Sequence, residues 1–332
     1  MLFRSAEERR RASVVTESLS QAATKHQSGD QDASGLIAGV RDELLLAGLQ
    51  PDYVELVDPL RLTPVTRTGS FSLLAVAVHC GSTRLIDHRF LMSRPPIVAI
   101  DGPAGAGKST VTRALAKRLG LLYLDTGAMY RGLTWWVRNQ GVDPADAAAI
   151  EPLLNDLNLQ LLSGSGGEVQ VLVNGQDVTA EIRSPEISAL VSTVAAHACV
   201  REALTAQQRA LGERGGLVAE GRDIGTAVFP SAECKVFLTA TVAERARRRA
   251  LDLEQRGFPV PPLQELEASI AERDQQDSSR AVAPLRQAED AMELITDGLT
   301  IEQVIAALED LFRARVPEDA WPAVGETAEQ AS

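Results

Sequence analysis

A glycine-rich segment at residues 102–109, Gly-Pro-Ala-Gly-Ala-Gly-Lys-Ser, constrains this 332-residue chain more than any other feature. It fits the pattern G-x-x-x-x-G-K-[ST], and it stands between the apolar run PIVAID and the amphipathic run KSTVTRALAKRLG. A strand, glycine loop and helix in this order form a nest of backbone N–H groups that binds phosphate. We therefore predict a nucleoside triphosphate site, in which Lys108 reaches the β- and γ-phosphates and the Ser109 hydroxyl holds Mg²⁺.

The segments after Pro96 alternate between short apolar runs and helical patterns. The runs LLYLD, GLVAEG, CKVFLTA and AMELIT predict buried strands, and VAERARRRALDLEQRG and TIEQVIAALEDLFRARV predict helices. Apolar strands separated by amphipathic helices are typical of an α/β fold, with a parallel sheet covered by helices on both faces. Alternating residues around the Asn174-Gly175 turn predict an antiparallel insertion at about 157–179, followed by a helix to His197.

The segment Arg94-Pro95-Pro96 predicts a domain boundary, because two prolines cannot continue a helix or a central strand. Ahead of it, helical patterns at 6–26 and 35–46 precede strand patterns in YVELVD, FSLLAVAVHC and TRLID, which together predict a small α+β domain. The predicted parts of the chain are this domain at 1–94, the α/β domain at 95–316 and a disordered acidic tail at 317–332.

Composition narrows the class of protein. Lys and Arg number 33 against 45 Asp and Glu, and the net charge of −12 argues against binding to nucleic acid or an anionic membrane. The chain opens without an apolar signal segment, and no uncharged run approaches the ~18 residues of a membrane span. Its three cysteines form no CxxC pair. We expect a cytoplasmic protein with reduced cysteines, and the oligomeric state stays open.

Arginines recur near the ends of the predicted strands of this acidic chain. Guanidinium groups match phosphate oxygens in pairs and stay charged at neutral pH, so such a set favours an anionic acceptor for the phosphoryl group. The sequence has no Asn-Lys-x-Asp base-reading motif, which argues against a GTPase. The arginines of the set are Arg131, Arg201, Arg222, Arg273 and Arg280.

From about Ile97 to Arg315 the chain resembles bacterial cytidylate kinases, because GPAGAGKST, LDTGAMYR, EGRDIGT, VFL and ERDQQDSSRAVAPL occur in that family's order and spacing. The resemblance implies the P-loop nucleoside monophosphate kinase fold, with the monophosphate-binding insertion at about 157–200 and a lid at about 245–274. It also implies transfer of the γ-phosphate of ATP to CMP or dCMP, giving CDP or dCDP, with Mg²⁺ as cofactor.

The same resemblance implies roles for individual residues. Those implied to be catalytic are Lys108, Arg131, Arg222 and Arg280. Those implied to bind ATP are Gly102, Pro103, Ala104, Gly105, Ala106, Gly107, Lys108, Ser109, Thr110, Arg245 and Arg249, with Arg248 as a further lid candidate. Those implied to bind CMP are Thr126, Arg131, Ser192, Arg201, Arg222, Asp223, Arg273, Asp277 and Arg280. Within this last set, the resemblance implies that Ser192, Arg201 and Asp223 read the cytosine edge. Glu220 stands where some relatives carry Asp, and its role stays open.

The front of the chain has a resemblance of its own. Residues from about 3 to 89 resemble the C-terminal domain of pantoate–β-alanine ligase, in SAEERRRA, YVELVD and GSTRLID. In cyanobacteria that ligase is fused ahead of cytidylate kinase, and this sequence is similar to the back end of such a fusion. The ligase's HxGH-type signature is not formed by His26, His79, His88 or His197. We therefore expect no ligase activity from this chain alone, whether the domain is a truncated product or a remnant retained for packing.

Two other interpretations remain. The chain could be a kinase for another nucleoside monophosphate, such as UMP or AMP, or a non-catalytic nucleotide-binding or scaffolding protein. The intact Lys108-Ser109 pair and the arginine set favour an enzyme over a scaffold.

Overall fold

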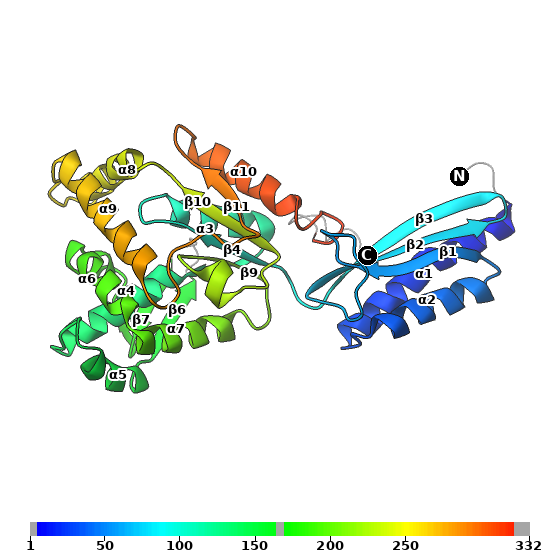
Figure 1. Ribbon diagram of the computed structural model, residues 1–332, viewed down its shortest axis with the longest axis horizontal. Coiled ribbons are helices and arrows are strands. Elements are labelled where there is room, and N and C mark those ends of the chain that lie inside the picture. The colour runs from blue at the N-terminus through cyan, green and yellow to red at the C-terminus, as the bar shows by residue number, and fades with distance from the viewer. Residues whose placement is uncertain (1–4, 164–168, 322–332) are drawn as a thin grey trace. The chain divides into compact units, whose positions relative to one another are not determined.

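The computed structural model describes residues 5–163 and 169–321. The chain divides into two compact units (Figure 1): a first unit of Met1–Pro96 with Arg315–Ser332, and a second unit of Ile97–Ala314. Residues 322–332, which are most of the predicted acidic tail, lie outside the described residues. Residues 164–168, which are rich in serine and glycine, also lie outside them.

Two helices and an antiparallel sheet make up most of the first unit. Its elements are α1 (Ala6–Gln27), α2 (Ala33–Leu46), β1 (Gln50–Val57), β2 (Phe71–Cys80) and β3 (Thr83–Met92), with the strands in the order β1-β2-β3. Ser5 and Glu8 form a capping box at the start of α1. The Asp32 side chain accepts a hydrogen bond from the backbone N–H of Gly35 and caps α2, so this helix begins two residues before the predicted start. The predicted α+β composition is confirmed.

Strand β3 is longer than the pattern TRLID indicates. All of its residues from Thr83 to Met92 have a partner in β2. The second half of the strand carries the polar side chains of His88 and Arg89, which are exposed, and this hides its alternation in the sequence.

The segment after α10 completes the first unit. The backbone N–H groups of Ala320 and Trp321 both donate to the carbonyl of Pro317, which makes a tight turn. His88 Nε2 of β3 lies 2.8 Å from the Asp319 carboxylate. The described part of the predicted tail is thus held against β3.

The second unit contains a five-stranded sheet in which every pair of neighbours is parallel. Its strands are β4 (Ile97–Asp101), β5 (Leu122–Asp125), β9 (Leu217–Gly221), β10 (Cys234–Thr239) and β11 (Met292–Ile295), in the order β11-β10-β4-β9-β5. The side chains of β4 are buried on both faces of the sheet. The predicted parallel sheet is therefore confirmed.

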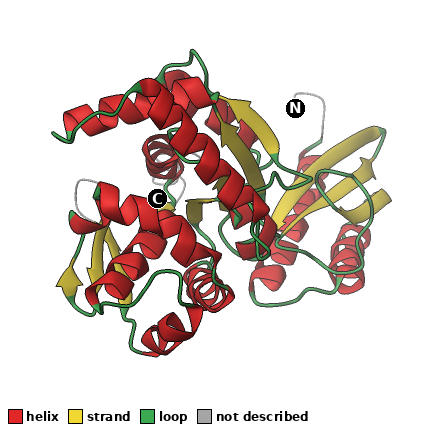
Figure 2. Cartoon of the chain, turned by 60° about the vertical axis from the view of Figure 1, so that its left-hand side comes forward, coloured by secondary structure: helices red, strands yellow, loops and turns green. Residues whose placement is uncertain are grey.

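Helices surround this sheet (Figure 2). They are α3 (Lys108–Leu119), α4 (Thr126–Asn139), α5 (Ala147–Asn155), α6 (Pro185–Ala196), α7 (Ala198–Leu211), α8 (Val242–Gln255), α9 (Leu263–Ser279) and α10 (Ile301–Arg313). Helices α4 and α7 share one core with Ile97 and Ala99 of β4, whereas α3 packs against α10. Helices α8 and α9 join through a small core of their own, made by Ala246, Leu253, Leu266 and Ile270. Of these helices, the sequence patterns quoted above single out α3, α6, α8 and α10.

The antiparallel insertion is also confirmed. It comprises β6 (Leu159–Ser163), β7 (Val169–Val173) and β8 (Gln176–Asp177), in the order β6-β7-β8. Asn174 (φ 50°) and Gly175 (φ 81°) make the turn between β7 and β8, where two left-handed residues suit an Asn-Gly pair. A short 3₁₀ turn at Glu181–Arg183 leads into α6.

Among the described residues, no single helix has both the length and the apolar character needed to cross a membrane. Helices α6 and α7 meet the length and composition test only as a pair, and that pair is bent by 96°.

The sheet also fixes where a site can form. The chain leaves β4 toward β5 on one side of the sheet and later reaches β10 on the other side. In open α/β sheets, ligands bind outside the carboxyl ends of the strands at such a change of direction. The loops after β4, β5 and β9 meet at this edge.

Candidate active site

The loop after β4 has a backbone that only glycine fits at its first position. Gly102 has φ 148°, and a Cβ on it would lie 2.0 Å from the carbonyl oxygen of Leu238 in β10. Gly105 and Gly107 also have positive φ values, 78° and 88°. Helix α3 begins directly after Gly107, so its free N–H groups face the inside of the loop.

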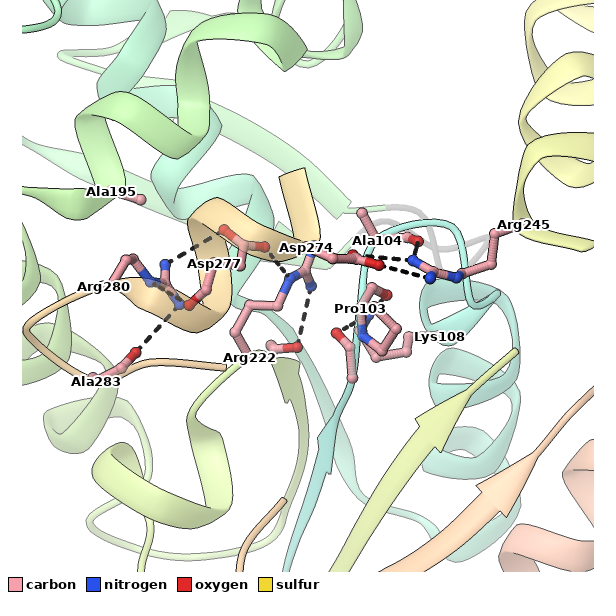
Figure 3. A network of polar contacts seen from close by, with 12 residues as sticks. Pro103, Ala104, Lys108, Ala195, Arg222, Arg245, Asp274, Asp277, Arg280 and Ala283 are labelled. Atoms are coloured by element: carbon pink, nitrogen blue, oxygen red, sulfur yellow. Dashed lines mark hydrogen bonds and ion pairs between the residues drawn. The ribbon is translucent and has the colours of Figure 1, made fainter. Parts of the chain in front are cut away.

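Lys108 is buried in this loop. Its Nζ donates to the carbonyl oxygens of Gly102 and Pro103, both at 2.8 Å (Figure 3). Burial, together with the positive charge of Arg222, lowers the pKa of Lys108 to about 7. A bound phosphate would favour the protonated form of Lys108. The loop therefore places this lysine where an anionic ligand would stabilise its positive charge.

Oxygen ligands for a magnesium ion lie beside the loop. The Glu220 carboxylate is buried at the end of β9 and accepts a hydrogen bond from the Tyr123 hydroxyl. Burial raises the pKa of Glu220, as does the nearby Asp125 carboxylate, whereas Lys108 and the Ser109 hydroxyl lower it. Hydroxyl and carboxylate oxygens suit Mg²⁺, which usually takes one or two protein ligands together with phosphates and water. In the described part of the chain, no group of three or more His, Cys, Asp or Glu residues is arranged to hold a metal ion.

A second group of charged side chains comes from α4, from the segment after β9 and from α9. Arg222, which follows β9, donates from Nε to Asp277 of α9 at 2.9 Å. Arg280 donates from Nε to the carbonyl oxygen of Asp277, and Arg131 of α4 pairs with Asp125 at 3.2 Å. Asp277 has a lowered pKa: burial raises it, but three arginines, with Arg222 first among them, lower it more.

Three arginines of this region are incompletely paired. The Nε atoms of Arg131, Arg201 and Arg273 are buried and have no hydrogen-bond partner among the described residues. Burial, together with the positive charges of Arg222, Arg131 and Arg249, lowers the pKa of Arg273 to about 10. An arginine that is desolvated among other arginines is strained until an anion arrives.

The side chains predicted to bind the base are all buried. Arg201 of α7 forms a buried ion pair with Asp223, and its guanidinium carbon lies 5.4 Å from the centre of the Tyr130 ring. Ser192 of α6 is buried nearby on the same cleft wall. Charged and aromatic groups fixed in this way can hydrogen-bond and stack on a flat heterocycle.

These groups share one cleft of about 1440 Å³, larger than the roughly 300–1,000 Å³ of a pocket for a single small ligand. Most of the residues predicted for ATP and CMP line it. The lining members of those two sets are Ala104, Gly105, Ala106, Gly107, Lys108, Ser109, Thr110, Thr126, Arg131, Ser192, Arg201, Arg222, Asp223, Arg249, Arg273, Asp277 and Arg280, and Arg248 joins them.

Three predicted residues do not line the cleft. The carbonyl oxygens of Gly102 and Pro103 accept hydrogen bonds from Lys108 Nζ, so these two residues position the lysine within the loop. Arg245 does not line the cleft, because its guanidinium is bonded to Asp274 and to the carbonyl oxygen of Ala104 (Figure 3). Its Nε also donates to the carbonyl oxygen of Ala240. Thr126 lines the cleft, but its hydroxyl donates to the carbonyl oxygen of Glu220 at 2.7 Å.

Sequence reasoning missed Asp101. Its buried carboxylate accepts hydrogen bonds from the backbone N–H groups of Ile224 (2.8 Å) and Gly225 (2.7 Å). The carboxylate thereby ties the end of β4 to the segment that presents Arg222 and Asp223. An acidic residue directly before the glycine loop is the only signal that could have pointed to it.

The comparisons with known proteins cover both parts of the chain. Residues 98–314 match the family model "Cytidylate kinase", and residues 3–90 match the model "Pantoate-beta-alanine ligase". A "Bifunctional pantoate ligase/cytidylate kinase" from Synechococcus sp. (strain CC9605) is 68% identical over 88% of this chain and 61% of its own length. A protein with the same description from Synechococcus sp. (strain CC9902) is 62% identical over 96% of this chain and 65% of its own length.

The chain thus spans about three fifths of the length of these curated relatives. Among solved structures, a shikimate kinase from Bacteroides thetaiotaomicron is 16% identical, covers 66% of this chain and 98% of its own length, and has a TM-score of 0.33.

Asp101 predicts how stability depends on pH. Burial raises its pKa from 3.8 to about 6, so between these values the folded protein binds more protons than the unfolded chain. Stability therefore falls as pH rises from about 4 to about 6, by up to about 3 kcal/mol from this group. Asp101→Asn carries no such charge. Urea unfolding followed by tryptophan fluorescence should show the variant gaining on the wild type by up to that amount between about pH 4 and pH 7. A stability difference that is the same at both pH values would contradict the assignment.

Proposed function

The chain belongs to the cytidylate kinase family, whose model covers residues 98–314, and on that premise we propose that it transfers the γ-phosphoryl group of ATP to CMP or dCMP. The observation that carries the proposal is the incomplete pairing of Arg131, Arg201 and Arg273 in a cleft that also contains the glycine loop. In a chain of net charge −12, a cleft with surplus cations fits two anionic nucleotides.

On the donor side, the backbone N–H groups of residues 104–109 and the Lys108 ammonium hold the β- and γ-phosphates of ATP. Ser109 and Glu220 would hold Mg²⁺ through their oxygen atoms, and the ion would neutralise charge on the phosphates. Lys108 is already oriented by two carbonyl oxygens, so it reaches the triphosphate with little loss of conformational freedom.

On the acceptor side, Arg131, Arg222, Arg273 and Arg280 bind the phosphate of CMP. Asp277 fixes Arg222 and Arg280 in place, so their forks can point at phosphate oxygens. A loose transition state spreads charge over the moving phosphoryl group, and these cations stabilise that charge. The proposed reaction needs no side-chain nucleophile.

Base recognition is assigned to Ser192, Arg201 and Asp223. The Arg201–Asp223 pair presents both a donor and an acceptor in a fixed, buried arrangement, which suits the amino group and ring nitrogen of cytosine. Adenine carries a similar amino group and ring nitrogen, but its second ring would have to displace this buried pair, which is costly. A site for UMP or AMP is the second candidate.

We expect Lys108→Ala to lower the rate of CMP-dependent ADP formation by about a thousandfold or more, because the variant removes a cation that faces the transferred group. Lys117→Ala removes an exposed lysine from the same helix and should leave the rate within about twofold of the wild type. A coupled spectrophotometric assay measures both. Near wild-type turnover in Lys108→Ala would overturn the proposed function, and the absence of CMP-dependent ADP formation in the wild type would favour a non-catalytic nucleotide-binding protein.

The acceptor base can be tested by ranking substrates. CMP and dCMP should have the highest kcat/KM, and AMP should fall about a thousandfold or more below them, because its second ring would have to displace the buried Arg201–Asp223 pair. Steady-state assays with CMP, dCMP, UMP and AMP at fixed ATP give the ranking. A preference for UMP or AMP would show that the cleft has been assigned to the wrong nucleotide.

The first unit matches the ligase family model, and we propose that the 332-residue chain by itself forms no pantothenate. None of its four histidines stands in the HxGH-type arrangement that the resemblance to the ligase associates with ATP use. Incubating the purified chain with ATP, pantoate and β-alanine should give no pantothenate above a blank without enzyme. Any pantothenate above that blank contradicts this expectation.

A further inference from the structure

Helix α9 carries two carboxylates one turn apart, and they face different halves of the cleft. Asp274 faces the glycine loop through Arg245, and Asp277 faces the acceptor side through Arg222 (Figure 3). Residues three apart on a helix lie on the same side of it, so one rigid element touches both halves.

Arg245 is held by four hydrogen bonds. Nη1 and Nη2 donate to the two oxygens of Asp274 at 3.0 and 2.6 Å, and Nε donates to the carbonyl oxygen of Ala240 at 3.0 Å. Nη1 also donates to the carbonyl oxygen of Ala104 in the glycine loop at 3.2 Å. The Arg245 side chain is only 5% exposed, so this planar fork has no freedom to turn without breaking a bond.

The loop and the two helices are also in close steric contact. A Cβ placed on Gly105 would lie 3.3 Å from the Cβ of Arg245. A phosphate that orders the backbone of residues 104–107 must therefore also fix Arg245, and with it Asp274. Since Asp277 and Arg273 move with α9, occupancy of the loop reaches the acceptor-side cations.

We propose that the Arg245–Asp274 ion pair couples the two nucleotide sites, so that a nucleotide bound at the glycine loop raises the affinity of the acceptor site through α9. The pair acts as a positioning element, because neither residue lines the cleft. The inference rests on the proposed function, because it takes the glycine loop as the donor site and the arginine cluster as the acceptor site.

The two sites are coupled only if each ligand stabilises the same arrangement of α9. A triphosphate orders the loop and so fixes Arg245, and an acceptor phosphate draws in Arg222 and Arg273. Both ligands favour the same orientation of α9, so each ligand should bind more tightly in the presence of the other.

The test uses Asp274→Asn in the full chain. Asparagine has the same shape, but its amide NH₂ would face an Arg245 N–H, so the bidentate pair is lost. Calorimetric titration gives the Kd of CMP with and without a saturating non-hydrolysable ATP analogue and Mg²⁺. We expect the analogue to tighten CMP binding about tenfold in the wild type and less than twofold in Asp274→Asn. The Kd of CMP measured alone should stay within about threefold of the wild type.

Three further measurements separate this role from others. Glu265→Gln removes an exposed carboxylate from the same helix and should keep the full tenfold effect. Asp274→Glu keeps the charge and should recover part of the effect, which distinguishes loss of the pair from misfolding. Thermal unfolding followed by circular dichroism verifies that each variant is folded.

The outcomes are distinct. If Asp274→Asn keeps the tenfold effect, Arg245 serves only the loop and the proposal is overturned, although the proposed function stands. A wild type without coupling also overturns it. If the wild type makes no ADP from ATP and CMP, the proposed function fails, and the inference fails with it.

Discussion

Buried positive charge is the constraint on which the second unit depends. Lys108 and Arg273 are both desolvated, and the pKa of each is lowered, which means that the folded protein carries cations in an unfavourable environment. Such an arrangement is stable only because the surrounding sheet and helices are fixed by a continuous apolar core. The sheet thus supports a set of charges that is completed by anionic ligands.

Carboxylates reduce the electrostatic cost of burying these cations, but they do not remove it. Asp277, Asp223 and Asp125 each hold an arginine in a defined direction, but none of these pairs uses every donor of its guanidinium. The three arginines, Arg222, Arg201 and Arg131, all line one cleft. An ion pair of this kind orients a cation rather than removing it, which is what electrostatic preorganisation requires.

The sequence predicts the features that are local in the chain. The glycine loop, the strand before it and the helix after it follow from residues 97–119 alone, because turn geometry and apolar pattern are short-range properties. The antiparallel insertion follows from alternation and one Asn-Gly turn. The resemblance to a family was needed to single out Ser192 and Asp277.

Contacts between distant segments could not be predicted in this way. The carboxylate of Asp101 accepts from residues 123 and 124 positions later in the chain, and nothing in either segment indicates the other. The resemblance to a family implied the triphosphate as a partner of Arg245, but it did not indicate Asp274, which the packing of α8 on α9 puts within reach. Helix periodicity gives the face of a residue but not the element that this face meets.

The route of the chain between the two units has a consequence for biosynthesis. The second unit lies within the sequence of the first, since β3 precedes it and the turn at Pro317–Trp321 follows it. His88 therefore meets Asp319 only after 231 more residues have left the ribosome. Nascent chains that stall before that point lack this contact of β3, so the second unit can be complete before the first unit is.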